Sequence, residues 1–216
     1  MGQTPPVHEA AERRDWPAYF DRIEGKPARE TMLRALDGFG DVDPSDRGLA
    51  VDLGCGSGID IGVMLERGWR VWGGDGSEDG LSRARARAGC ADAIGEGRLE
   101  LVRMDFGSVE IPRARWVNAS FSLPFCPPAD WEGLWAKIDG AIKPGGRFSG
   151  QFFGDRDDWA ILEDRTHLTR SETLGLFDQY ILEFFQEEDR ASAHQGEAHK
   201  HWHVFHVVAR KREGSR

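Results

Sequence analysis

The feature that most constrains this chain is a short apolar run that ends in three glycines, the segment LAVDLGCGSG at residues 49–58. The run has the length of a buried strand, and residues 59–67 continue with the spacing of an amphipathic helix. Glycine tolerates positive φ and lacks a Cβ atom, so a ligand can approach the backbone of such a turn closely. Free N–H groups at the start of the helix favour a carboxylate or phosphate. The sequence therefore predicts a strand, a glycine turn and a helix that together form a small-molecule site.

A carboxylate two residues before the first glycine narrows the kind of ligand. Asp52 is expected at the end of the strand, where it would repel a pyrophosphate but attract an ammonium or a sulfonium. The glycine spacing also departs from the Gly-x-Gly-x-x-Gly fingerprint of dinucleotide-binding proteins. These observations favour S-adenosylmethionine over NAD. A glycine turn with a purely structural role is the alternative.

Two segments resemble signatures of a known family. Residues 51–58 are similar to the first motif of the class I S-adenosylmethionine-dependent methyltransferases, and the Lys-Pro-Gly-Gly turn at residues 143–146 resembles a second signature. The resemblance implies an α/β fold with a Rossmann-like, doubly wound, seven-stranded sheet, mostly parallel with one antiparallel strand near the edge and helices on both faces. The short N-terminal extension and compact core further resemble the tellurite-resistance and thiopurine type of small-molecule methyltransferases.

Composition restricts the partners and the compartment. The 216 residues carry a formal net charge of −9, which disfavours a nucleic-acid partner. No apolar run approaches the roughly 20 residues that span a bilayer, and no secretory segment opens the chain. Three scattered cysteines are typical of reduced thiols. We therefore expect a cytoplasmic protein without a membrane partner, either a monomer or a homodimer.

Local patterns predict the domain organisation and the elements of the chain. Residues 1–40 are expected to form an N-terminal helical extension or lid, and residues 41–216 the S-adenosylmethionine-binding domain. Helices are expected from Pro27, over 77–88 and 131–142, and from Thr169 to Phe177, with a surface loop at 89–97. Strands are expected over 69–74, 98–103, 116–121, 147–153, 180–186 and 203–210. In similar families the last two strands form an antiparallel pair at one sheet edge.

The resemblance also implies which residues bind the cofactor. Asp75 follows Gly54 by 21 residues, at the end of the next strand, and is expected to accept both ribose hydroxyls; a helix N-cap is its alternative role. Asp105 is expected to bind the adenine amino group, or to be an ordinary turn residue, and Arg29 to pair with the carboxylate of the cofactor. The full set of predicted cofactor-binding residues is Asp52, Gly54, Cys55, Gly56, Gly58, Asp75, Gly76, Ser77, Met104, Asp105, Phe106, Asn118, Tyr19 and Arg29.

The acceptor side is less defined by the sequence. Aromatic residues expected around it are Trp16, Phe121, Phe125 and Trp159, although Trp16 and its neighbours can equally pack the extension on the domain. A general base is needed only when the acceptor carries a proton at neutral pH. Candidates by residue type and loop position are Tyr19, Asp155, His167 and His199. The late histidines lack interleaved ligands at the usual spacing, so no metal site is predicted.

These inferences lead to one main hypothesis and three alternatives. The main hypothesis is transfer of a methyl group from S-adenosylmethionine to a small-molecule acceptor by in-line displacement. A protein or RNA methyltransferase is one alternative, and a non-catalytic S-adenosylmethionine-binding module is another. The acidic cluster at residues 155–158 also leaves open a related fold that uses the decarboxylated cofactor to build polyamines.

Overall fold

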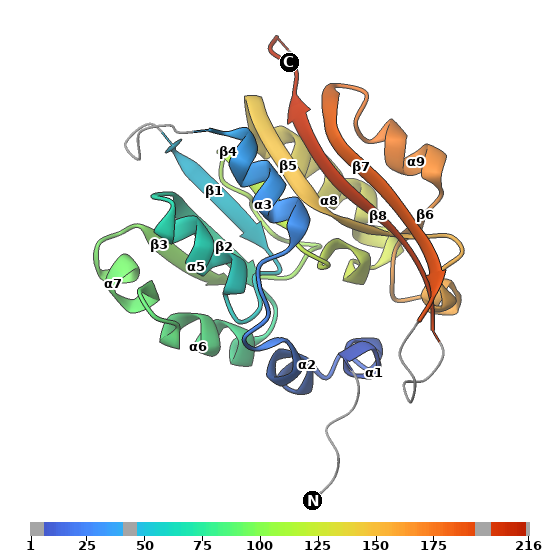
Figure 1. Cartoon of the computed structure of the whole chain (residues 1–216), viewed down its shortest axis with the longest axis horizontal. Helices are drawn as coiled ribbons and strands as arrows, with labels where there is room; N and C mark the ends of the chain where they lie inside the picture. The colour runs from blue at the N-terminus through green and yellow to red at the C-terminus, as the bar shows by residue number, and fades with distance from the viewer. Residues whose placement is uncertain (1–6, 41–46, 193–199, 215–216) are drawn as a thin grey trace, which may run out of the picture.

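The computed structural model describes residues 7–40, 47–192 and 200–214 of the chain. Its centre is a mixed, twisted sheet with the strand order β3-β2-β1-β4-β5-β8-β7, and a short additional strand, β6, pairs with β5 (Figure 1). The strands are β1 (Leu49–Leu53), β2 (Arg70–Asp75), β3 (Leu99–Arg103), β4 (Ala114–Ala119), β5 (Ile142–Gly154), β6 (His167–Leu168), β7 (Tyr180–Ala191) and β8 (His201–Lys211).

Along the main path of seven strands, the pairs from β3 to β5 are parallel, and β8 is antiparallel to both of its neighbours. This arrangement confirms the predicted Rossmann-like sheet with one antiparallel strand near the edge. The late strands β7 and β8 form the expected antiparallel pair, and both extend beyond the predicted ranges. Strand β6 was not predicted.

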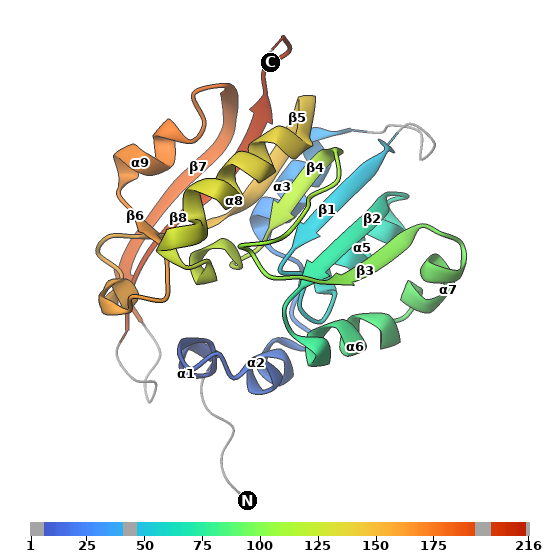
Figure 2. The same cartoon turned by 180° about the vertical axis from the view of Figure 1, so that it is seen from behind.

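Helices cover both faces of the sheet (Figures 1 and 2). The helices described are α1 (Val7–Glu12), α2 (Trp16–Ile23), α3 (Glu30–Gly38), α5 (Ile59–Glu66), α6 (Glu78–Ala86), α7 (Cys90–Gly95), α8 (Pro128–Ala141) and α9 (Arg170–Gly175), with single 3-10 turns η1 (Leu123–Phe125) and η2 (Asp158–Ile161). None of them is long and apolar enough to cross a bilayer.

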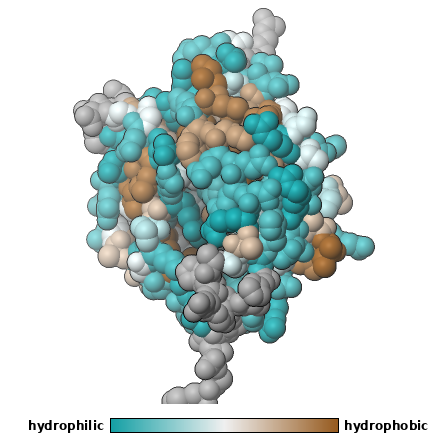
Figure 3. Space-filling model, turned by 45° about the vertical axis from the view of Figure 1, so that its right-hand side comes forward, coloured by the Kyte–Doolittle hydropathy of each residue, from teal (hydrophilic) through white to brown (hydrophobic). Residues whose placement is uncertain are grey.

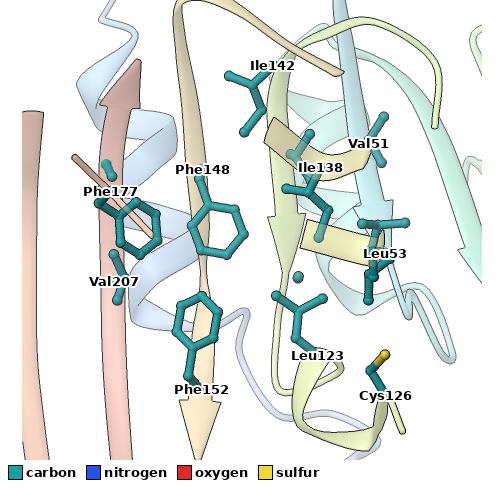
Figure 4. Close-up of a cluster of buried hydrophobic side chains, with 14 of the residues drawn as sticks. Val51, Leu53, Leu123, Cys126, Ile138, Ile142, Phe148, Phe152, Phe177 and Val207 are labelled. Atoms are coloured by element: carbon teal, nitrogen blue, oxygen red, sulfur yellow. The ribbon is translucent and has the colours of Figure 1, made fainter. Parts of the chain in front are cut away.

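Two apolar cores lie on opposite faces of the sheet. One contains Met32 of α3 and Ile61 of α5, and the other contains Ile138 of α8. In the second core, the rings of Phe148 and Phe152 on β5 stack with centroids 5.7 Å apart, and their centroids lie 5.5 and 6.0 Å from that of Phe177 (Figure 4). Because α3 contributes buried side chains to the first core, it is part of the sheet's covering layer. The predicted boundary at residue 40 stays a prediction.

Several predicted boundaries need correction. The helix expected from Pro27 begins at Glu30, with Arg29 as its N-cap in extended conformation. The expected loop at 89–97 contains the helix α7, because Cys90 and Ala93 are buried and anchor it. The helix after Thr169 has the predicted capping box but ends at Gly175.

The Lys-Pro-Gly-Gly segment lies inside β5 and not before it. Pairing with β4 jumps from Ala114↔Ile142 to Trp116↔Arg147, so the segment bulges out of the ladder. Gly145 has a φ of 74°, which a residue with a side chain rarely adopts. The turn is therefore an irregularity within a long strand.

Figure 3, which brings the β7 side of the molecule forward, shows a largely hydrophilic face with an apolar patch in its upper part. Large apolar side chains that are exposed on β7 are Ile181 and Leu182. Strand β7 is the edge of the sheet.

Candidate cofactor and acceptor site

A cavity of about 370 Å³ lies beyond the carboxyl ends of β1, β2, β3 and β4, where ligands bind in open α/β sheets. Residues 14–29, which include α2, form its opposite wall. Its size is in the usual range for small-molecule sites, roughly 300–1,000 Å³. The predicted site residues that line it are Trp16, Tyr19, Arg29, Asp52, Gly54, Cys55, Gly56, Asp75, Gly76, Ser77, Met104, Asp105, Phe106, Phe121 and Phe125.

The glycine turn has the predicted backbone conformation. Gly54, Gly56 and Gly58 have φ values of 71°, 51° and 76°. A Cβ atom on Gly54 would lie 2.2 Å from Cβ of Ser122, and one on Gly56 would lie 2.8 Å from the ring of Phe20. Gly58 does not line the cavity; it is the N-cap of α5 and packs against α6. The absence of a side chain at Gly54 and Gly56 thus allows Ser122 and Phe20 to approach closely, and it also leaves the backbone exposed to the cavity.

A buried pair of carboxylates lies at the end of β1. Asp52 is 2% exposed, and its Oδ1 accepts a hydrogen bond of 2.8 Å from the Asn118 amide, while its Oδ2 has no partner. Oδ2 of Asp60 accepts hydrogen bonds from Asn118 (3.0 Å) and Ser120 (2.6 Å). Burial, and then the charge of Asp60, raise the pKa of Asp52 well above its ordinary value. An unpartnered, buried acceptor beside a second carboxylate is suited to a cationic donor such as an ammonium group.

Two residues of this group differ from the sequence analysis. Asn118, predicted to bind the cofactor, is fully buried behind Asp52 and does not line the cavity. It also accepts a hydrogen bond from the Ser149 hydroxyl, so both ends of its amide are used by the protein. Asp60 lines the cavity but was not predicted. Its signal is an acidic residue in the first turn of the helix that follows the glycines.

Asp75 lies at the end of β2 with its carboxylate held by backbone groups. Its Oδ2 accepts from the N–H of Gly56 and its Oδ1 from the N–H of Ser77, both at 2.7 Å. Burial raises its pKa, and these backbone hydrogen bonds oppose the rise. Each carboxylate oxygen retains accepting capacity toward the cavity, as binding of two ribose hydroxyls would require. The N-cap of α6 is Ser77, which accepts from the N–H of Gly80.

Asp105 lies beyond the end of β3 in a turn. It accepts hydrogen bonds from the backbone N–H (2.9 Å) and the hydroxyl (2.6 Å) of Ser108, and these lower its pKa. It also lines the cavity together with Met104 and Phe106. The turn conformation and a position next to a bound adenine are compatible, and the role of Asp105 as a ligand stays a prediction.

Cys55 is buried within the glycine turn and lines the cavity. Burial raises the pKa of its thiol well above the ordinary value, and the negative charges of Asp52 and Asp75 add to the rise. A neutral thiol is a poor nucleophile, so Cys55 is suited to packing and not to covalent chemistry.

The opposite wall of the cavity is aromatic. The ring of Trp16 packs edge-on against Phe125, with centroids 5.0 Å apart, and against Tyr19, at 5.9 Å. Ion pairs attach this wall to both sides of the cavity: Arg83 of α6 contacts Asp21 at 2.7 Å, and Arg14 contacts Asp164 at 2.9 Å. Helix α2 and the turn that precedes it therefore bridge the mouth of the cavity.

Two of the four predicted general-base candidates, Asp155 and His167, do not line the cavity. Asp155 faces His203, and His167 lies against the ring of Phe153. His199 lies outside the described residues. Of the four, Tyr19 alone lines the cavity within the described part of the chain.

Trp159, predicted to bind the acceptor, also lies outside the cavity. It is 5% exposed and packs behind Phe125, with ring centroids 6.3 Å apart. The Lys200 ammonium is 4.1 Å from its ring centroid and pairs with the buried Asp157. These contacts and the pairing of β6 with β5 hold the loop after β5 against the sheet, and no residue of this loop lines the cavity.

Two acids and a histidine meet on the β7–β8 hairpin. Potential ligand atoms of Glu187, Asp189 and His203 lie within 4.8 Å of one another. The Arg156 guanidinium donates to Glu187 at 2.8 Å and to Asp189 at 2.6 Å. The positive charge of Arg156 thus already balances these carboxylates, so their proximity does not by itself indicate a metal ion.

Comparisons with known proteins address the family. Residues 50–146 match the family model of a methyltransferase domain. A carboxy-S-adenosyl-L-methionine synthase from Shewanella loihica is 28% identical over 124 residues, which cover 56% of this chain and 50% of that protein. One from Shewanella oneidensis is 27% identical over 182 residues, covering 78% and 74%. The chain spans about half the length of the first of these relatives.

Solved structures share the fold at low identity. TehB from Haemophilus influenzae superposes with a TM-score of 0.68 at 12% identity, covering 91% of this chain and 67% of TehB. The 1,6-didemethyltoxoflavin-N1-methyltransferase from Burkholderia thailandensis, solved with bound S-adenosylhomocysteine, has a TM-score of 0.63 at 19% identity, covering 99% and 93%. The methyltransferase-domain match over residues 50–146, the Rossmann-like sheet and the glycine turn together support a class I S-adenosylmethionine-dependent methyltransferase with S-adenosylmethionine as its cofactor.

Proposed function

We propose that this protein transfers the methyl group of S-adenosylmethionine to a small-molecule acceptor. The observation that carries the proposal is the unpartnered Oδ2 of Asp52, buried beside Asp60 at the end of β1. A carboxylate in this position is costly without a cationic partner, and the ammonium group of the cofactor would supply one. The residues present therefore fit the cofactor.

The remaining cofactor contacts follow from the order of the strands. Asp75 would accept the ribose hydroxyls, and Asp105, with Met104 and Phe106, would contact the adenine at the end of β3. Arg29 would pair with the carboxylate of the cofactor. When bound, S-adenosylmethionine supplies an electrophilic methyl group on a sulfonium that departs as a neutral thioether.

The acceptor would lie between the end of β4 and the wall formed by α2. Trp16, Phe121 and Phe125 line this part of the cavity and would hold an apolar or aromatic molecule and exclude water. Their contribution is to orient the nucleophile in line with the departing sulfur. Tyr19 is the candidate for accepting a proton, for acceptors that carry one.

The shape and charge of the molecule favour a small acceptor over RNA or protein. Residues 14–29 cover the mouth of the cavity, so a polymer would have to displace them. The net charge of −9 adds repulsion toward a phosphate backbone. We accordingly interpret residues 14–29 as the part of the predicted N-terminal extension that forms the lid.

The first test is calorimetric titration with S-adenosylmethionine, with NAD as the control ligand. We expect binding of S-adenosylmethionine alone. A panel of small thiols, phenols, amines and chalcogen oxyanions is then incubated with the protein, and formation of S-adenosylhomocysteine is followed by mass spectrometry. Binding of NAD would contradict the cofactor assignment. Binding of S-adenosylmethionine without turnover of any acceptor would favour a non-catalytic binding module.

A further inference from the structure

We infer that Gln151 is a positioning residue for the cofactor, because it fixes both Phe121 and the start of α3 and thereby holds the Arg29 guanidinium over the cavity. The inference rests on the proposed function, since it takes Arg29 as the ligand of the cofactor's carboxylate. Gln151 does not line the cavity and would act through these two neighbours.

Gln151 uses both ends of its amide to join two elements. It is 1% exposed on β5; its Oε1 accepts a hydrogen bond of 2.9 Å from the N–H of Phe121, and its Nε2 donates one of 2.7 Å to the hydroxyl of Thr31. Thr31 is also 1% exposed and lies in the first turn of α3. A buried amide satisfied in this way restricts the relative positions of its partners, because moving either would leave a polar group unpaired.

Phe121 has a backbone conformation that needs such support. Its φ is 54°, in the left-handed region that bulky residues rarely adopt. The hydroxyl of Ser120 donates to Asp60, and that of Ser122 donates to the carbonyl oxygen of Leu53, so the residues on both sides are also held. Strained conformations persist where their surroundings over-determine them, and they concentrate at functional sites.

The Phe121 ring in turn supports Arg29. The guanidinium carbon lies 4.7 Å from the ring centroid, within the range of a cation–π interaction. In the described part of the chain, no carboxylate oxygen lies within ion-pair distance of Arg29, so its charge is available to a ligand. His206 packs edge-on against the same ring at 6.0 Å and fixes its orientation from the side of β8.

These contacts form a closed circuit. Gln151 binds Thr31, Thr31 follows Arg29 by two residues in the chain, the guanidinium of Arg29 lies on the ring of Phe121, and the N–H of Phe121 returns to Gln151. Loss of the Gln151 amide would free Phe121 to leave the left-handed conformation and would move the ring from under Arg29. The contacts at the ends of β2 and β3 lie outside the circuit and would be unaffected.

The test compares two ligands by calorimetry: S-adenosylhomocysteine, and 5′-methylthioadenosine, which has the same adenosine and sulfur but no amino-acid group. For Arg29→Met we expect about 10- to 100-fold weaker binding of S-adenosylhomocysteine, the loss of a charge-assisted contact. For Gln151→Met we expect roughly 3- to 30-fold weaker binding, because the guanidinium remains but is less well placed. Binding of 5′-methylthioadenosine should change by less than about twofold in both variants.

A second pair of variants guards against misfolding of Gln151→Met. Thr31→Val removes the hydroxyl that accepts from Gln151 and should show the same selective loss of affinity for S-adenosylhomocysteine. Thr31→Ser keeps the hydroxyl and should bind both ligands as the wild-type protein does. The matched control is Thr173→Val, a buried threonine whose hydroxyl donates to the Thr169 carbonyl in α9, away from the cavity. It should leave the affinity for both ligands unchanged.

The outcomes separate the two levels of the proposal. Unchanged affinity for S-adenosylhomocysteine in Gln151→Met or Thr31→Val, or equal losses for both ligands, would overturn the positioning role. If the wild-type protein bound neither ligand, the proposed function itself would fail.

Discussion

The two walls of the cavity are built in different ways. At the ends of β1 and β2, Asp52 and Asp75 are buried or half-buried and are held by short hydrogen bonds to an amide or to backbone N–H groups. On the facing wall, Trp16 belongs to α2, and an ion pair of this helix, between Asp21 and Arg83, joins partly exposed side chains. The first wall is defined by backbone turns and buried charge, and the second by side-chain packing.

This difference has energetic consequences. A backbone turn with positive φ and a buried carboxylate tolerate few substitutions, because strain or an unpaired polar group costs several kilocalories per mole. An exposed ion pair contributes about 0–1 kcal/mol and is screened by salt. We therefore expect substitutions on the first wall to have larger effects than those on the second.

The largest effect is expected for Gly54→Ala. The new Cβ would lie 2.2 Å from Cβ of Ser122, and the φ of 71° is unfavourable for alanine. We expect the free energy of unfolding to fall by about 2–4 kcal/mol, measured by urea denaturation. The control is Gly133→Ala in the exposed face of α8, where a Cβ meets nothing within 4 Å; it should stabilise by about 0.5–1 kcal/mol. Similar effects of the two substitutions would contradict the comparison.

Asp75→Ala tests the polar wall directly. Loss of the carboxylate removes the expected ribose acceptor and also the acceptor for the N–H groups of Gly56 and Ser77. We expect binding of S-adenosylmethionine to weaken by about 1.5–3 kcal/mol in calorimetric titration. Unchanged affinity would remove Asp75 from the site.

Asp52→Asn tests the role of buried charge. Because burial raises the pKa of Asp52 above its unfolded value, the free protein holds its proton to higher pH than the unfolded chain does. This residue therefore lowers the stability of the ligand-free protein as pH rises from the unfolded pKa through the folded pKa. The variant should lose that dependence. Its free energy of unfolding relative to that of the wild-type protein should therefore be higher at neutral pH than at pH about 4, measured by denaturation of both proteins at both pH values.

The same variant should bind S-adenosylmethionine more weakly, by about 1 kcal/mol, since a neutral amide accepts a weaker hydrogen bond than a carboxylate. The affinity of the wild-type protein for a cationic ligand should increase with rising pH, and binding should release the proton held by Asp52. Calorimetry in two buffers of different ionisation enthalpy would detect that release. Binding that is independent of pH in this range would count against a cation at Asp52.

The smallest effect is expected on the second wall, for Asp21→Ala in α2. Arg83 would lose one exposed ion pair but keep its pair with Asp79 at 2.7 Å. We expect a loss of stability below about 1 kcal/mol that disappears at high salt. A loss as large as that for Gly54→Ala would show that this wall is held by more than surface charge.

The residues that line the cavity at the ends of the strands were largely predictable because their signals are local. Asp52, Asp75 and Asp105 each follow a strand, and right-handed connections bring the ends of parallel strands to one edge of the sheet. Residues chosen from residue type and loop position alone line the cavity less often. Asp155 and Trp159 were predicted to act on the acceptor, yet neither lines the cavity, and the pairing of β6 with β5 holds the loop that carries them against the sheet.

The helix α7 shows the same limit within the fold. Its segment is rich in glycine, which has low helix propensity, and the sequence therefore predicts a loop there. Burial of Cys90 and Ala93 supplies the stability that propensity lacks. Tertiary packing overrides a weak local preference at such a position.

The sequence by itself determined the order of the seven main strands along the chain, the glycine turn and the carboxylates at three strand ends, because each depends on neighbours in the chain. Only the tertiary structure decided that Asp60 joins Asp52 through Asn118, and that Gln151 reaches Thr31 across 120 residues. Such contacts depend on how α3 and α5 lie on the sheet. That placement is set by the packing of many side chains at once, which no local pattern encodes.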